Sequence, residues 1–240
     1  MPLTDFNTLT FDCYGTLIDW ESGIATALQP LLARAATPLS REAALAAFGR
    51  HETRLEAAHP TLRYRDLLGR VHDALAAEWG VAADADESRR FGLSVGDWPA
   101  FPDSADALRY LKQHYRLVIL SNVDRESFQS SNARLGVAFD AVYTAEDIGS
   151  YKPDPRNFAW LIEHLAALGV ARSQILHTAQ SLFHDHGPAN AAGLASAWID
   201  RRQDAAGWGA TAAPPEGVRY DYRFTSLAEM ASAHQAEAAG

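Results

Sequence analysis

The feature that most constrains this chain is a short apolar stretch near its N-terminus that ends in an acid and a tight turn. Residues 9–17 read LTFDCYGTL, so apolar residues and threonines lead into Asp12, and Gly15 follows. This pattern is typical of a buried strand, and in open α/β sheets ligands bind outside the carboxyl ends of the strands. Because side chains alternate along a strand, Asp12 and Tyr14 are expected on one side. Considered alone, Asp12 could also be a strand-end residue that caps the next turn.

The rest of the chain predicts an α/β fold with an inserted helical block. Residues 21–96 are rich in Ala, Leu and Arg, with apolar residues at helical spacing, and predict about four helices. From residue 103 onward short apolar runs alternate with helical segments, which indicates a Rossmann-like, doubly wound parallel sheet. We therefore predict a core of residues 1–20 and 97–240 and a helical cap of residues 21–96. The later strands are expected at 117–120, 141–143, 175–177, 195–199 and 222–224.

Composition limits the classes of partner. Acids outnumber bases by 30 to 21 and the formal net charge is -9, so neither a nucleic acid nor an anionic membrane is expected to bind. The N-terminus has no basic segment leading into an apolar run, and no stretch is long enough to span a bilayer. Cys13 is the only cysteine, which excludes an intramolecular disulfide. These features predict a soluble, cytoplasmic protein.

Three short motifs together resemble those of the haloacid dehalogenase superfamily. They are DCYGT at 12–16, SN at 121–122 and KPD at 152–154. Their order and spacing match the first three motifs of the superfamily, and the resemblance extends over nearly the whole chain. It implies a Rossmann-like core, a cap inserted between the first two motifs, and a hydrolase that acts on a small anionic substrate. A homodimer is common among such proteins, so a homodimer is a possible state of this chain.

The resemblance implies a catalytic set in the core. Asp12 would be the nucleophile, forming an ester that water then cleaves. Lys152 would be the cation that keeps Asp12 ionised and oriented, although a solvated loop lysine is the alternative. Thr16 would donate a hydrogen bond to Asp12 and fix its rotamer. Asp185 would position the hydrolytic water, and its alternative role is that of a helix N-cap.

Tyr14 separates two chemistries within the superfamily. The phosphatases carry a second Asp two residues after the nucleophile as a general acid, whereas the L-2-haloacid dehalogenases carry Tyr. A phenol with a pKa of about 10 replaces that acid poorly, but a halide leaves without a proton. The resemblance thus favours hydrolytic dehalogenation of short 2-haloalkanoic acids. The alternatives are hydrolysis of another small carboxylate, such as ring opening of a strained cyclic amino acid, hydrolysis of a phosphate ester, or a degenerate small-anion binding protein.

The remaining core positions match the dehalogenases only in part. Ser121 and Asn122 lie where the family binds the carboxylate or phosphate of its substrate. Phe158 and Leu182 stand where those dehalogenases have Tyr and Asn, which makes the pocket more apolar. Gln180 replaces a magnesium-binding Asp of the phosphatases, so neither a metal nor another cofactor is predicted. A transition-metal site is the less favoured alternative to structural capping for three histidines, namely His177, His184 and His186.

A cationic residue of the cap is expected to complete the site. The dehalogenases use a cap Arg to bind the carboxylate of the substrate or the departing halide. Arg50 and Arg54 are four residues apart and therefore share one face of a predicted helix. We predict that one of them binds the substrate, with Arg63 and Arg65 as the alternatives.

Overall fold

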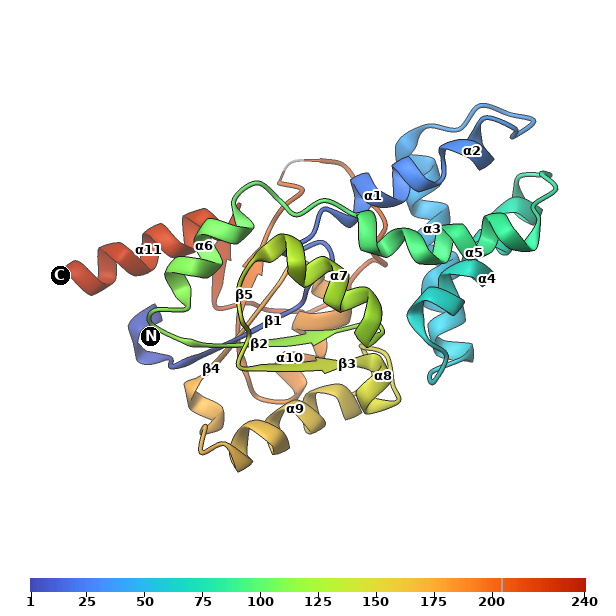
Figure 1. The fold of residues 1–240 in the computed structure, drawn as a ribbon. Helices are drawn as coiled ribbons and strands as arrows, with labels where there is room; N and C mark the ends of the chain where they lie inside the picture. The colour runs from blue at the N-terminus through green and yellow to red at the C-terminus, as the bar shows by residue number, and fades with distance from the viewer. Residues whose placement is uncertain (204) are drawn as a thin grey trace.

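The core of the molecule is a parallel sheet of six strands, as the sequence predicts (Figure 1). The computed structural model describes residues 1–203 and 205–240. The strand order is β3-β2-β1-β4-β5-β6, so the chain builds outward from β1 in one direction and then returns to build in the other. A ligand crevice is expected between β1 and β4, where the order reverses. The strands are β1 Thr8–Phe11, β2 Arg116–Ser121, β3 Ala141–Thr144, β4 Ile175–Ala179, β5 Ala195–Ile199 and β6 Tyr222–Phe224.

Two layers of helices cover the sheet because the side chains of its strands alternate. In β2, Leu117 and Ile119 join one apolar cluster, whereas Val118 and Leu120 join another on the opposite face. Residues of α6, α7 and α11 belong to the first cluster and residues of α9 and α10 to the second. Burial on both faces accounts for the continuous apolar run of this strand. These helices, with the short α8, are α6 Ser104–Leu111, α7 Arg125–Leu135, α8 Ala145–Ile148, α9 Arg156–Ala167, α10 Gly187–Ala191 and α11 Leu227–Ala239.

Five helices lie beyond the carboxyl ends of β2 and β3, at the upper right of Figure 1. We call them the cap helices: α1 Trp20–Ala27, α2 Gln29–Leu32, α3 Arg41–Ala58, α4 Tyr64–Glu78 and α5 Ala85–Leu93. The short α2 makes them one more than the sequence predicts. The Ser40 side chain accepts a hydrogen bond from the backbone N–H of Ala43 and so begins α3, as its sequence suggests. The division into a core and a cap stays a prediction.

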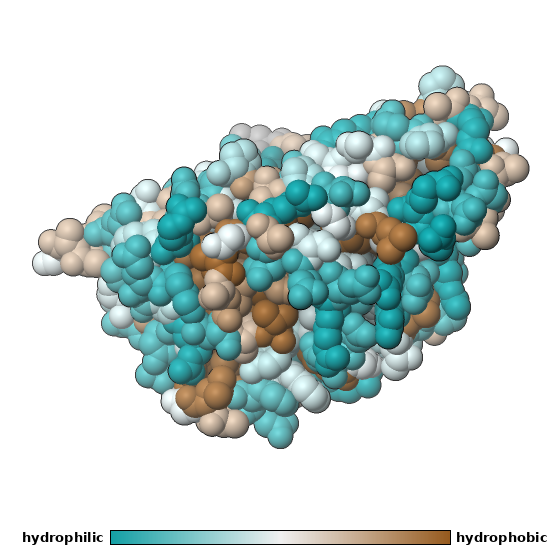
Figure 2. All heavy atoms as spheres, in the orientation of Figure 1, coloured by the Kyte–Doolittle hydropathy of each residue, from teal (hydrophilic) through white to brown (hydrophobic). Residues whose placement is uncertain are grey.

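Short helical turns connect several of these elements: η1 Leu3–Asp5, η2 Ser94–Asp97, η3 Arg172–Gln174 and η4 Leu182–His186. On the face shown in Figure 2, hydrophilic residues dominate and hydrophobic ones gather in small, separate groups. Within residues 1–203 and 205–240, no helix combines the length and the apolar character needed to cross a membrane.

Candidate active site

A pocket that opens to solvent, with a cavity volume of about 30 Å³, lies at the carboxyl edge of β1, β2 and β4, next to the cap helices. The strand register explains this position, because Phe11 pairs with both Ile119 of β2 and Thr178 of β4, so the three strands end close together. The lining from the cap helices is Trp20, Glu52, Glu56 and Tyr64, and the lining from the rest of the chain is Asp12, Tyr14, Ser121, Asn122, Lys152, Gln180, Ser181, His184, Asp185 and Thr211.

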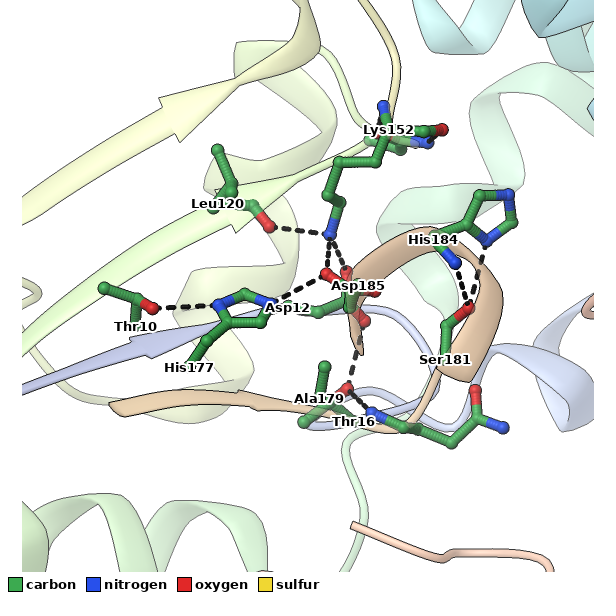
Figure 3. Close-up of polar contacts among 12 residues, drawn as sticks. Thr10, Asp12, Thr16, Leu120, Lys152, His177, Ala179, Ser181, His184 and Asp185 are labelled. Atoms are coloured by element: carbon green, nitrogen blue, oxygen red, sulfur yellow. Dashed lines mark hydrogen bonds and ion pairs between the residues drawn. The ribbon is translucent and has the colours of Figure 1, made fainter. Parts of the chain in front are cut away.

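Both oxygens of the Asp12 carboxylate accept hydrogen bonds from neighbouring side chains (Figure 3). The Lys152 Nζ donates to Oδ1 over 3.0 Å, and the Thr16 hydroxyl donates to Oδ2 over 3.0 Å. The Thr16 oxygen also accepts a hydrogen bond of 2.9 Å from the backbone N–H of Gln180, which links the first turn to the loop after β4. The bond from Thr16 to Asp12 that the sequence predicts is therefore confirmed. Two hydrogen bonds of this kind fix the orientation of the carboxylate.

Lys152 joins Asp12 to a second buried acid, Asp185. Its Nζ donates to the Asp185 Oδ1 over 2.6 Å and to the Leu120 carbonyl over 2.9 Å, so three acceptors satisfy the ammonium group. His177 Nε2 lies 2.9 Å from the same Asp185 oxygen, and its Nδ1 lies 2.8 Å from the hydroxyl of Thr10. The other oxygen, Asp185 Oδ2, is buried and has no hydrogen-bond partner among the described residues. It is therefore free to accept a hydrogen bond from a bound molecule.

The charges of this network set the ionisation of each carboxyl. Burial raises the pKa of Asp12 to about 6, although the nearby Lys152 opposes the shift. Burial alone would also raise the pKa of Asp185, but Lys152 and His177 hold it below its ordinary value. Desolvation lowers the pKa of Lys152, yet the two carboxylates outweigh that effect and raise it. At neutral pH the network therefore comprises one ammonium and two carboxylates.

Tyr14 lines the cavity as a neutral ring. Its hydroxyl lies 3.0 Å from the Ser131 Oγ, and its ring meets the Trp98 ring edge-on at 5.6 Å. Burial raises the pKa of this phenol well above its ordinary value. A phenol in this state is a poor proton donor for a leaving group.

Ser121 and Asn122, which follow one another at the end of β2, have different surroundings. The Ser121 hydroxyl is buried and has no hydrogen-bond partner among the described residues, so a ligand in the cavity can bond to it. The Asn122 side chain instead accepts a hydrogen bond from the Lys152 N–H over 2.7 Å and donates one to the Lys152 carbonyl over 2.9 Å. It also donates to Glu56 Oε1 over 3.1 Å. Asn122 thus holds the backbone at Lys152 in place and also bonds to a cap helix.

The turn η4 directs Asp185 into the cavity. Ser181 begins this turn by accepting a hydrogen bond of 2.9 Å from the backbone N–H of His184. The capping role considered for Asp185 therefore belongs to Ser181, and Asp185 is free to bond to Lys152 and His177. His186 bonds to Ser196 and to a backbone carbonyl of β4.

The residues at the cavity do not fit a metal ion. The ammonium group of Lys152 bonds to both Asp12 and Asp185, the two acids that a magnesium site at this edge would use. Gln180 offers only an amide, whose Oε1 lies 3.4 Å from the Thr211 hydroxyl. Across residues 1–203 and 205–240, no group of three His, Cys, Asp or Glu side chains is arranged to hold a metal.

The predicted cap cation is wrong. Arg50 and Arg54 share a face of α3, as the spacing indicates, but that face is exposed to solvent: the Arg50 side chain is 61% exposed and bonds to Glu78 over 2.9 Å. The alternatives also lie outside the cavity, since Arg63 pairs with Glu146 and the Arg65 side chain pairs with Glu126. The spacing determined which residues share a face but not which face points inward.

Phe158 does not line the cavity either, so its predicted role in substrate binding is wrong. It is buried in the apolar cluster between α9 and the sheet, where its ring meets the ring of His177 edge-on at 4.9 Å. Phe158 therefore supports the residue that bonds to Asp185.

Sequence reasoning missed the two acids that the cap helices contribute, Glu52 and Glu56. They lie on the face of α3 opposite to Arg50 and Arg54 and are 3% and 5% exposed. Their signal was present in the sequence, because both positions continue the helical stripe of Leu45, Phe48 and Leu55. An acid on such an apolar stripe indicates a polar site in contact with it.

Comparisons with known proteins show the family of the chain. A family model for haloacid dehalogenase-like hydrolases matches residues 6–197. An (S)-2-haloacid dehalogenase from Pseudomonas putida is 26% identical over 208 residues, which are 82% of this chain and 86% of that protein.

Solved structures share the fold. The L-2-haloacid dehalogenase from Xanthobacter autotrophicus, solved also with chloropropionic acid covalently bound, is 20% identical with a TM-score of 0.76, covering 95% of this chain and 97% of that one. The putative HAD-hydrolase YfnB from Bacillus subtilis, bound to magnesium, is 20% identical with a TM-score of 0.74, covering 96% of this chain and 99% of that one.

Proposed function

Because the chain belongs to the haloacid dehalogenase-like hydrolases, we propose that it cleaves the carbon–halogen bond of a short 2-haloalkanoic acid through an ester on Asp12. The observation that carries this proposal is the pairing of an oriented Asp12 carboxylate with the neutral phenol of Tyr14 at the same cavity. The position that would hold a carboxylic acid for an alcohol leaving group holds a poor acid instead. A halide leaves without a proton, so it suits this site.

In the first step an Asp12 oxygen attacks the carbon that carries the halogen. The new C–O bond forms as the C–halogen bond breaks, and the halide departs with the bonding electron pair. Lys152 and Thr16 hold the carboxylate in one orientation, which lowers the entropic part of the barrier. Asp12 as a whole residue is only 6% exposed, so burial removes water from its carboxylate.

In the second step water attacks the carboxyl carbon of the Asp12 ester. Asp185 Oδ2, which has no hydrogen-bond partner among the described residues, accepts a proton from the water. The ammonium of Lys152 faces the charge that develops on the ester oxygen. The C–O bond to the carboxyl carbon then breaks, and the product alcohol takes a proton and leaves with an oxygen that began in Asp12. The balance is one water consumed, and one alcohol, one halide and one proton released. The covalently bound chloropropionic acid in the Xanthobacter structure supports this route.

A single turnover in 18O-labelled water tests the ester. With enzyme in excess over 2-chloropropionate, the product of the first turnover should contain no label, and the peptide that carries Asp12 should gain one 18O atom. Label in the product of that turnover would mean that water attacks the substrate directly and would refute the role of Asp12. In steady-state assays, a phosphate ester of an ordinary alcohol with Mg2+ should not be hydrolysed, since its alkoxide leaving group needs a proton that Tyr14 does not supply.

A further inference from the structure

The wall that α3 contributes to the cavity carries two buried acids. Glu52 and Glu56 are four residues apart on the same face of the helix, and both line the cavity that contains Asp12. Tyr64 donates a hydrogen bond of 2.6 Å to Glu52 Oε1, and Asn122 donates one to Glu56 Oε1. Each carboxyl thus has one oxygen held by the protein. Within the described residues, the Oε2 atom of neither acid accepts a hydrogen bond.

Among the described residues, no lysine or arginine forms an ion pair with this pair of acids. The nearest basic nitrogen, His184 Nε2, lies 3.8 Å from Glu56 Oε2. Burial lowers the pKa of His184 to about 4, so this imidazole is neutral at physiological pH. Burial raises the pKa of Glu52 to about 8 and that of Glu56 well above its ordinary value, so Glu52 is mostly protonated at neutral pH in the empty cavity. A cation bound between the two open Oε2 atoms would favour the ionised carboxylates. The arrangement therefore provides a place for a cation that arrives from outside.

The charge of the whole cavity favours the same conclusion. Its lining contains four acids and one lysine, and that lysine already bonds to Asp12 and Asp185. Even with Glu52 and Glu56 protonated, Asp12, Asp185 and Lys152 leave the cavity with one more negative than positive charge, which disfavours a substrate that carries a carboxylate alone. A second unpartnered group, the buried Ser121 hydroxyl, lines the same cavity and is 3% exposed. Ser121 can donate a hydrogen bond to the carboxylate of a substrate. Glu52 and Glu56 can accept hydrogen bonds from an ammonium group at the other end of that substrate.

We propose that Glu52 and Glu56 bind a protonated amine, so that the substrate is a short 2-halo acid that also carries an ammonium group. This proposal rests on the proposed function and names its substrate class. The substrate is then a zwitterion with no net charge. Its ammonium group bonds to the two Oε2 atoms, its carboxylate accepts from Ser121, and its C2 faces Asp12.

A matched pair of substrates tests the proposal. The 3-amino-2-chloropropionate ion differs from 2-chloropropionate only by an ammonium group on C3. Halide release by the full-length enzyme should proceed with a kcat/KM at least tenfold higher for the amino compound. Glu52→Gln and Glu56→Gln keep the size of each side chain and should each reduce this preference at least tenfold. Glu78→Gln alters an exposed acid of the cap helices and is the control, because it should leave the preference unchanged.

A binding measurement separates this proposal from the chemistry. In calorimetry with wild-type enzyme, the product analogue 3-amino-2-hydroxypropionate should bind at least tenfold more tightly than lactate, and the difference should disappear in Glu52→Gln. Equal affinities for the two ligands would overturn the amine site whether or not halide is released. Tight binding of the amino ligand with no halide release from either substrate would leave the amine site standing and would refute the dehalogenase reaction instead.

Discussion

The two walls of the cavity are built differently. The wall from the sheet consists of residues that directly follow strand ends or the loops after them, and its polar groups bond to one another through Lys152. The wall from α3 is one helical face with two acids that bond to separate partners, Tyr64 and Asn122. In the first arrangement an ammonium group holds two carboxylates in fixed positions, whereas in the second no cation joins the two acids. We therefore expect the sheet to provide the chemistry of the proposed reaction and α3 to provide its selectivity.

The largest expected effect comes from the sheet wall. Asp12→Asn keeps the shape of the side chain but removes the nucleophile, so kcat for halide release should fall by roughly 10⁴-fold or more. Folding should persist, because Lys152 keeps its bonds to Asp185 and to the Leu120 carbonyl. Steady-state halide release measures the effect, with Asp106→Asn, an exposed aspartate, as the control. Residual activity within tenfold of wild type would show that Asp12 is not the nucleophile. The sheet wall would then contain no residue with a chemical role that the α3 wall lacks.

The same contrast explains what the sequence could predict. Asp12 was predicted because it follows a strand end, and Ser121 and Lys152 because their motifs resemble those of the haloacid dehalogenase superfamily; all three line the cavity at one edge of the parallel sheet. The strands were predicted within two residues of their observed ends, and in β2 the continuous apolar run reflects burial on both faces. The hydrogen bond from Thr16 to Asp12 was also predicted, since Thr16 lies in the turn that follows Asp12.

The residues of the wall from α3 could not be predicted in the same way. Helical spacing groups Arg50 with Arg54 and Glu52 with Glu56, but the tertiary packing of α3 decides which group faces inward. The expectation of an anionic substrate favoured the arginines, although the apolar stripe of α3 contains the acids. The orientation of Asp185 was likewise beyond local reasoning, because it depends on the turn that Ser181 begins.

The next largest effect is on stability, and it comes from the wall that α3 contributes. Burial raises the pKa of Glu52 from its ordinary 4.5 to about 8. Between these values the folded protein binds the proton more tightly than the unfolded chain, so the contribution of Glu52 is fully present below pH 4.5 and is lost as the pH rises through 8. Glu52→Gln removes this loss. Without ligand, the variant should therefore gain stability relative to wild type by a few kcal/mol as the pH rises from 5 to 9.

Urea unfolding of wild type and variant at both pH values measures this gain. Glu78→Gln serves as the control, because Glu78 is 38% exposed and its substitution should produce a difference that changes little with pH. If the difference in the free energy of unfolding between Glu52→Gln and wild type stays constant from pH 5 to 9, Glu52 is not held in the buried environment described here. The contrast between the walls would then rest on Glu56 alone.

The smallest expected effect comes from the outer face of the same helix. Arg50→Ala removes a surface ion pair with Glu78, and such pairs contribute about 0–1 kcal/mol to stability. Arg54 is also exposed, and neither side chain lines the cavity. Both Arg50→Ala and Arg54→Ala should therefore keep kcat/KM within about twofold of wild type, because a group that does not touch the substrate contributes nothing to its transition state. Halide-release kinetics would measure this beside Glu52→Gln, which alters the opposite face of α3. A loss of tenfold or more in either arginine variant would mean that α3 turns this face toward the substrate during the reaction, and α3 would then present cations rather than acids to it.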